Sequence, residues 1–131
     1  MEPKLRNFLF CDAVVPALDG KMICYGIFSD LFVPKFPVTY PQFSIMSTWI
    51  KGEGFHIQQI KIMNSSKSMI VSQSPEMFFT LNNPTETVNL KTDVNQIVFQ
   101  DGGPYYFQVF YENINYLHLK MNYIQIVKII Y

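Results

Sequence analysis

Apolar and polar residues alternate along most of the chain, whereas apolar residues at helical spacing are nearly absent. Alternation puts successive side chains on opposite faces of a strand, and β-branched and aromatic residues are enriched in the alternating segments. The segments predicted as strands are 7–15, 22–28 (reaching as far as 33), 43–51, 55–64, 68–72, 77–81, 85–90, 95–100, 105–112, 116–121 and 123–130. Many short strands without crossover helices predict an all-β fold: an antiparallel two-sheet sandwich, immunoglobulin-like or jelly-roll-like.

Glycine and proline mark the turns between these segments. Asp19-Gly20 is the clearest hairpin signal, because glycine adopts positive φ without a steric cost. The segment 34–41 contains Pro34, Pro37 and Pro41, so we expect either a rigid, extended crossing loop or an edge of a sheet. Either the Phe36–Pro37 or the Tyr40–Pro41 peptide bond is a candidate for the cis form.

The segment 105–112 shows most clearly how the two faces of a strand differ. One face carries Tyr105, Phe107, Val109 and Tyr111, which we assign to the core, and the other mixes aromatic and polar residues from Tyr106 to Glu112. The same reasoning over the whole chain predicts these buried residues: Phe8 or Leu9, Ile27, Ile45, Ile57, Phe107 and Val109.

The composition narrows the classes of partner. The 131 residues favour a single domain spanning 1–131, and only 15% of them are charged, with a formal net charge of zero. Arg6 is the only arginine, so the clustered basic residues that bind nucleic acid are missing. The apolar run 8–15 after Lys4 and Arg6 is short and interrupted by Asp12, so we interpret it as a strand rather than a signal peptide. We expect a cytoplasmic protein without a membrane span, and sparse charge favours self-association.

The two cysteines flank the predicted hairpin turn. If the strands pair tightly across Asp19-Gly20, Cys11 falls opposite Phe28 and too far along the strand from Cys24 to bridge. If the loop is wider, the two cysteines point to opposite faces. Both alternatives predict free, buried thiols, as in a reducing compartment.

Catalytic and metal-binding patterns are weak. His56 and His118 are the candidate bases for a cysteine nucleophile, but both fit better as surface or hydrogen-bonded strand residues. The histidines and cysteines lack zinc-site spacing, and the acidic residues are scattered singly. The glycines near 52–54 and 102–103 lack the lysine and helix of a phosphate loop. We therefore expect no enzyme activity, no metal and no cofactor.

A set of short motifs resembles a known family. Asp19-Gly20-Lys21, then Gly26-Ile27-Phe28, then Phe36-Pro37 with Pro41 are similar to a bacterial family of small single-domain proteins of unknown function. The family pattern also has an early Asp, matched by Asp12, and a late G-x-Y-x-F strand, matched imperfectly from Gly103. The resemblance is specific only within residues 1–43, and it implies a bacterial cytoplasmic β-sandwich without an assigned activity.

The surplus of aromatic and apolar residues leads to the functional hypotheses. Both faces of the terminal strands are apolar, so we expect a protein-interaction or scaffolding domain that forms a homodimer or binds another protein. The residues assigned to this interaction surface are Tyr106, Phe110, Tyr116, Tyr123, Ile126 and Ile129. The alternative is a small-ligand or carbohydrate-binding module, in which exposed rings that include Tyr40 and Trp49 stack on a sugar.

Overall fold

The computed structural model describes the backbone of residues 3–113 and 120–130, and the side chains of residues 3–111 and 127–130. Within these ranges the chain forms strands and no helix, so the all-β prediction is confirmed and no helix that could cross a membrane is found. The strands are β1 (Lys4–Cys11), β2 (Ala13–Pro16), β3 (Met22–Tyr25), β4 (Asp30–Phe32), β5 (Val38–Ile50), β6 (Gly54–Met63), β7 (Ile70–Gln73), β8 (Met77–Leu81), β9 (Thr87–Phe99), β10 (Gly103–Asn113) and β11 (Lys120–Ile130).

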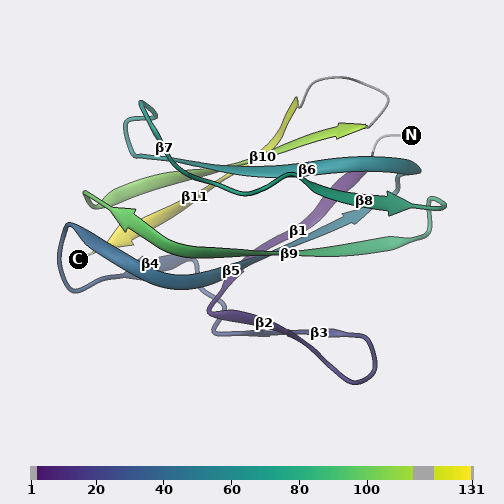
Figure 1. Cartoon of the computed structure of the whole chain (residues 1–131), viewed down its shortest axis with the longest axis horizontal. Coiled ribbons are helices and arrows are strands. Elements are labelled where there is room, and N and C mark those ends of the chain that lie inside the picture. The colour runs from purple at the N-terminus through teal and green to yellow at the C-terminus, as the bar shows by residue number, and fades with distance from the viewer. Residues whose placement is uncertain (1–2, 114–119, 131) are drawn as a thin grey trace.

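The strands form three sheets, two of which lie as facing layers (Figure 1). One layer has the order β1-β5-β9, and the other has the order β4-β11-β10-β6-β7, with β8 also paired to β6. The third sheet is the hairpin β2–β3, which projects below the first layer in Figure 1. We call this hairpin the arm.

Pairing is antiparallel throughout these sheets except at one edge. There β4 runs parallel to β11, from Asp30 opposite Lys128 to Phe32 opposite Ile130, so the prediction of wholly antiparallel pairing is wrong here. The physical reason is that β4 reaches the sheet from the end of the arm and is not joined to β11 by a hairpin. A tight turn therefore does not dictate its direction.

Aromatic rings from the two layers meet in a shared core. Phe107 of β10 contacts Phe10 of β1 at 4.8 Å between ring centroids, and Trp49 of β5 stacks on Phe79 of β8 at 5.5 Å. The alternation predicted for β10 is confirmed, because Tyr105, Phe107, Val109 and Tyr111 are all buried. Ile45 and Ile57 are also buried as predicted.

Two predictions of burial are wrong, and both lie beside the arm. Phe10 takes the core position expected of Phe8 or Leu9, while Phe8 is half-buried and Leu9 is exposed on the opposite face. Ile27 is 62% exposed, because β3 ends at Tyr25 and the chain turns at Gly26, where φ is +65°.

The ends of several strands also differ from the prediction. The expected strand 7–15 is divided at Asp12 into β1 and β2, and the expected strands 85–90 and 95–100 form the single strand β9. β5 begins already at Val38, so Pro41 lies inside a strand. This is possible because β1 pairs only from Ser44 onward, and the missing N–H of Pro41 interrupts a single ladder, that with β9. The Phe36–Pro37 peptide bond is cis, one of the two predicted alternatives.

Candidate interaction surface

The arm is a short hairpin with a well-defined turn. Its strands pair from Ala13 opposite Tyr25 to Pro16 opposite Met22. The turn is closed by the Ala17 N–H, which donates to the Lys21 carbonyl at 2.7 Å. Asp19 accepts a hydrogen bond from the Lys21 N–H at 3.1 Å, and Gly20 has a φ of +83°. The Asp-Gly-Lys motif is therefore the turn of this hairpin, as its residue types predict.

At the base of the arm the chain bends at Asp12. The Asp12 N–H donates to the carbonyls of both Tyr25 (2.8 Å) and Gly26 (3.2 Å), so regular pairing is interrupted there. The Asp12 carboxylate lies where a side chain on residue 26 would place its Cβ, and Gly26 also has positive φ. Glycine is therefore required at this position for two independent reasons. The early Asp and the Gly-x-Phe glycine, separate motifs in the sequence, are in direct contact.

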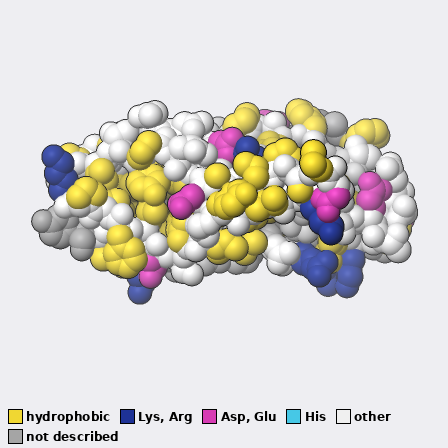
Figure 2. Space-filling model, turned by 90° about the horizontal axis from the view of Figure 1, so that it is seen from below, with side chains coloured by type: hydrophobic (Ala, Val, Ile, Leu, Met, Phe, Trp, Pro, Cys, Tyr) yellow, Lys and Arg dark blue, Asp and Glu magenta, His cyan; other side chains and the backbone are white. Residues whose placement is uncertain are grey.

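One face of the arm is apolar and exposed. Tyr25, Ile23 and Val15 lie on this face, and they are paired as Ala13–Tyr25 and Val15–Ile23. Tyr25 is 54% exposed, and Leu18 at the tip is fully exposed. Figure 2, which looks from the side on which the arm projects, shows apolar side chains in patches with only scattered charges between them. Isolated two-stranded hairpins are only marginally stable, so an apolar face in this position is a candidate contact surface.

The opposite face of the arm packs on the outer face of the β1-β5-β9 sheet. Val14 is buried there against Cys11 and Met46, and half-buried Cys24 joins the same cluster. Both cysteines are free, as predicted, but neither predicted register is correct. Phe10, not Cys11, lies opposite Phe28, and the bend folds the arm over the sheet so that the two cysteines meet.

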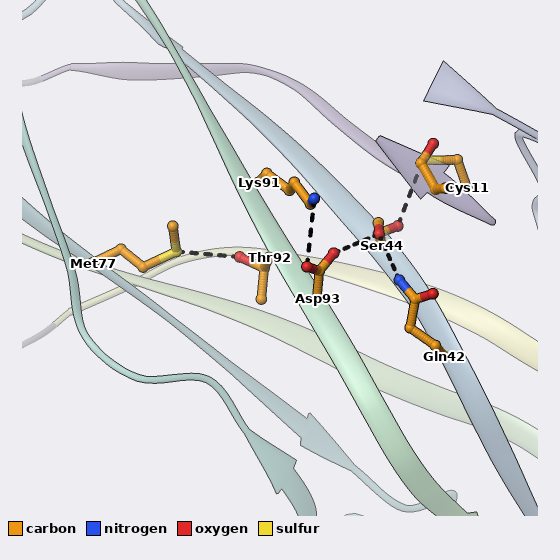
Figure 3. A network of polar contacts seen from close by, with 8 residues as sticks. Cys11, Gln42, Ser44, Met77, Lys91, Thr92 and Asp93 are labelled. Atoms are coloured by element: carbon orange, nitrogen blue, oxygen red, sulfur yellow. Dashed lines mark hydrogen bonds and ion pairs between the residues drawn. The ribbon is translucent and has the colours of Figure 1, made fainter. Parts of the chain in front are cut away.

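A polar network lies beside this cluster on the same outer face (Figure 3). The Ser44 hydroxyl donates to Asp93 at 2.7 Å and accepts from Gln42 at 3.2 Å, while Lys91 pairs with Asp93 at 3.5 Å. The Cys11 thiol points at the Ser44 carbonyl, 3.8 Å away. The network links β5 to β9 across the sheet and gives the arm a fixed base. Sequence reasoning missed it because β5 and β9 are distant in the sequence.

Of the predicted interaction surface, Tyr106 and Phe110 lie on the outer face of the larger sheet. Both are half-buried beneath lysines: the Lys67 ammonium is 4.4 Å from the Tyr106 ring and the Lys61 ammonium is 4.6 Å from the Phe110 ring. The exposed rings Phe55 and Phe78 lie on the same face. This face is a second apolar area, distinct from the arm.

The assignment of Ile129 to this surface is wrong. Ile129 is 1% exposed and packs in the core, because its partner Leu31 on β4 also faces inward. Tyr116 lies outside the described residues, as do the side chains of Tyr123 and Ile126.

Trp49 does not belong to an exposed aromatic platform. It is fully buried, and its indole N–H donates to the Gln58 side-chain oxygen at 2.7 Å. Tyr40 is half-buried and contacts the ring of Phe43, with 6.1 Å between centroids. A sugar cannot stack on an indole enclosed between two sheets, so the carbohydrate hypothesis loses its best residue.

His56 is also in the core, so of the two predicted alternatives to a catalytic base the surface position is wrong and the hydrogen-bonded strand residue is confirmed. Its ring lies beside Phe79 and Tyr111, and its Nε2 hydrogen-bonds to the Glu53 carbonyl at 2.8 Å. Burial lowers the pKa of His56, partly offset by that carbonyl. Cys11 packs on the outer face of the β1-β5-β9 sheet, whereas His56 lies in the core between the two layers. Cys11 and His56 therefore do not form a nucleophile–base pair. His118 lies outside the described residues.

A small cavity of about 190 Å³ opens where β7 and β9 form adjacent edges of the two layers. Its polar lining includes Ser72, Ser74, Thr92 and Asn95, and none of the described residues that line it is aromatic. Within the described residues, no group of three or more His, Cys, Asp or Glu side chains is arranged to hold a metal ion. The cavity suits only a small polar molecule.

The fold and this surface define an all-β domain with a projecting apolar arm. A family model matches residues 6–122, and the chain belongs to this family, the family of unknown function DUF6941. No curated protein matches the sequence. The resemblance to an uncharacterised family is therefore confirmed, and the family assigns no activity to the chain.

Proposed function

We propose that this chain is a non-enzymatic protein-interaction domain that forms a two-fold homodimer through the exposed face of its arm. The observation that carries the proposal is the group of apolar side chains on that face, with Tyr25 and Ile23 in its centre and Leu18 at its tip. Each large side chain that becomes fully buried contributes about 1.5–3 kcal/mol. A pair of arms packed face to face would bury two copies of this group.

A second copy of the chain is the occupant that the charge distribution favours. The chain has no net charge and only 15% charged residues, so long-range repulsion between copies is weak. Within the described arm, the ion pair of Lys21 with Asp19 lies at the turn and leaves the apolar face uncharged. The two-stranded sheet also has open edges, which offer backbone groups for pairing across a two-fold axis.

Sedimentation at micromolar concentration tests this proposal. We expect a dimer for the unmodified chain and at least a 30-fold weaker association for Ile23→Lys, since burying an unpaired ammonium costs about 2 kcal/mol or more. The matched control is Val98→Lys on β9, because Val98 is 40% exposed and Ile23 is 39% exposed. Phe78→Lys probes the other apolar area, the outer face of the larger sheet.

The outcomes separate the surfaces. Loss of the dimer in Ile23→Lys alone supports the arm, and loss in Phe78→Lys alone moves the interface to the larger sheet and overturns the proposal. A monomeric unmodified chain rules out self-association. Circular dichroism of each variant verifies that the fold is retained.

The proposal also covers the type of β fold, the bacterial source of the protein and its cellular compartment. The two layers share one core, which supports a β-sandwich of immunoglobulin-like or jelly-roll-like type. The motif resemblance supports a bacterial protein, and two free thiols are compatible with the reducing cytoplasm. Measurement of the thiol state in cells tests the compartment.

The cavity between β7 and β9 supports a second candidate function, the binding of a small polar ligand. Its volume of about 190 Å³ is below the roughly 300–1,000 Å³ of typical ligand sites, so a monosaccharide or polyol is the upper limit in size. A thermal-shift screen with such compounds tests it, because a ligand at 100 times its Kd stabilises the fold by about 2.7 kcal/mol. A shift that persists in a variant with Asn95→Leu excludes this cavity.

A further inference from the structure

The arm is held to the sheet by a cluster that contains both cysteines of the chain. Cys11 ends β1 and is fully buried, and Cys24 lies in β3 and is half-buried. Cys24 packs against the cluster that Cys11 forms with Val14 and Met46, and it lies close enough to Cys11 to help raise the pKa of that thiol. The Cys11 thiol also lies 3.5 Å from the Ala13 carbonyl, at the bend into the arm. Two thiols from different sheets therefore meet where the arm rests on the domain.

We propose that Cys11 and Cys24 are a redox-sensitive modification site, at which a small-molecule disulfide such as glutathione disulfide oxidises them to a reversible intramolecular disulfide. The bond would join the arm covalently to the outer face of the β1–β5 pair. This inference does not depend on the proposed homodimer, because Cys24 lies on the face of the arm opposite Tyr25 and Ile23, and Cys11 lies in β1 on the sheet beneath that face.

The different burial of the two thiols sets the order of the reaction. Cys24 is the more accessible, so its thiolate attacks one sulfur of the small disulfide and releases the first small thiolate. Cys11 is shielded from solvent, and burial, together with nearby Cys24 and Asp12, raises the pKa of its thiol to about 11. A thiol that stays protonated is a poor first nucleophile.

The second step closes the bond. Cys11 loses its proton to the released thiolate, attacks the Cys24 sulfur of the mixed disulfide, and expels the second small thiolate. In total two cysteine thiols give up two electrons and two protons, and one small disulfide becomes two small thiols. A reducing dithiol such as dithiothreitol reverses the reaction.

The consequence for the arm is a loss of freedom about the bend at Asp12. In the reduced chain the arm rests on the sheet through the small cluster around Cys11 and Met46. A disulfide between residues 11 and 24 closes a loop that contains the whole hairpin turn, and such cross-links restrict the opened states of the enclosed segment.

The test uses the whole purified chain, first reduced and then equilibrated with glutathione buffers of rising disulfide content. Thiol titration after denaturation is expected to fall from two thiols to none, with an intact mass lower by two hydrogen atoms and a Cys11–Cys24 link in the non-reduced peptide map. Hydrogen exchange of the arm amides is expected to slow at least tenfold after oxidation.

The single-cysteine variants provide the matched controls. Cys11→Ala is expected to stop at a mixed disulfide on Cys24, whereas Cys24→Ala is expected to react at least tenfold more slowly, because Cys11 is buried. A stable mixed disulfide in the unmodified chain, a Cys24–Cys24 bond between two chains, or reaction only after unfolding would each overturn the proposal. Oxidation of the monomeric variant Ile23→Lys separates this result from that of the homodimer.

Discussion

The hydrogen bond between Trp49 and Gln58 makes a quantitative prediction about the core. Both side chains are fully buried, they come from facing sheets, and their N–H···O distance is 2.7 Å. Trp49→Phe leaves the Gln58 oxygen without its donor, at a cost of about 1–3 kcal/mol. The lost part of the indole adds roughly 1 kcal/mol for the residual cavity. We therefore expect Trp49→Phe to lower the free energy of unfolding by about 2–4 kcal/mol.

The partner substitution completes a double-mutant cycle. Gln58→Met keeps the side-chain length but leaves the buried indole N–H unpaired, with an expected loss of about 1–3 kcal/mol. In the double variant neither polar group remains, so the unpaired-group penalties vanish and only the cavity persists. The combined loss is expected to be smaller than the sum of the two single losses by about 1–3 kcal/mol.

Urea unfolding followed by far-ultraviolet circular dichroism measures these values, because Trp49 is the only tryptophan and its fluorescence is lost in the variant. Tyr105→Phe combined with Trp49→Phe is the control pair, since Tyr105 contacts Phe99 and Asp101 whereas Trp49 contacts Phe79 and Gln58. That pair is expected to be additive within about 0.5 kcal/mol. Additivity of Trp49→Phe and Gln58→Met as well would refute the buried hydrogen bond.

Three further predictions concern single positions. Gly26→Ala is expected to lower the free energy of unfolding by several kcal/mol, because the added Cβ clashes with Asp12 and the backbone has an unfavourable positive φ. Gly20→Ala has the same unfavourable φ but meets no atom within 4 Å, so its expected cost is about 1–2 kcal/mol. Equal losses for the two variants in urea unfolding would contradict the Asp12 contact. Burial lowers the pKa of His56 below 6.5, so the unfolded chain binds a proton first as the pH falls. The stability present above pH 6.5 should therefore decline below that pH. In urea unfolding at about pH 7.5 and about pH 5.5, His56→Gln should lack the part of this decline that comes from His56. Tyr105→Phe removes a buried hydroxyl that donates to a turn carbonyl at 2.7 Å, and it is expected to cost about 1–2 kcal/mol, while a neutral result would show that water satisfies the turn.

The local pattern of residues was sufficient for much of the fold. Alternation of apolar and polar positions predicted the strands and the inward face of β10, because side chains alternate across any strand whatever its partner. The Asp-Gly-Lys turn was predictable for a similar reason, since positive φ at Gly20 is a property of that residue alone. The cis bond before Pro37 was one of two alternatives, and choosing between them required the structure.

The candidate surface was only partly predictable. Alternation indicated that Tyr106 and Phe110 lie on an outer face, but it assigned the terminal strand no definite inner side, and Ile129 proved to be in the core. When both faces of a strand are apolar, periodicity cannot distinguish them, because only the neighbouring layer determines which face loses its water.

The sequence by itself determined where this chain is extended, where its one clear hairpin turns, and that it belongs among all-β domains. Only the tertiary structure decided that the chain bends at Asp12, that the arm folds over Cys11 and Met46, and that β4 joins β11 in parallel. The first group depends on the backbone preferences of a few adjacent residues. The second depends on contacts between segments far apart in the chain, whose energies are set by which surfaces meet and exclude water.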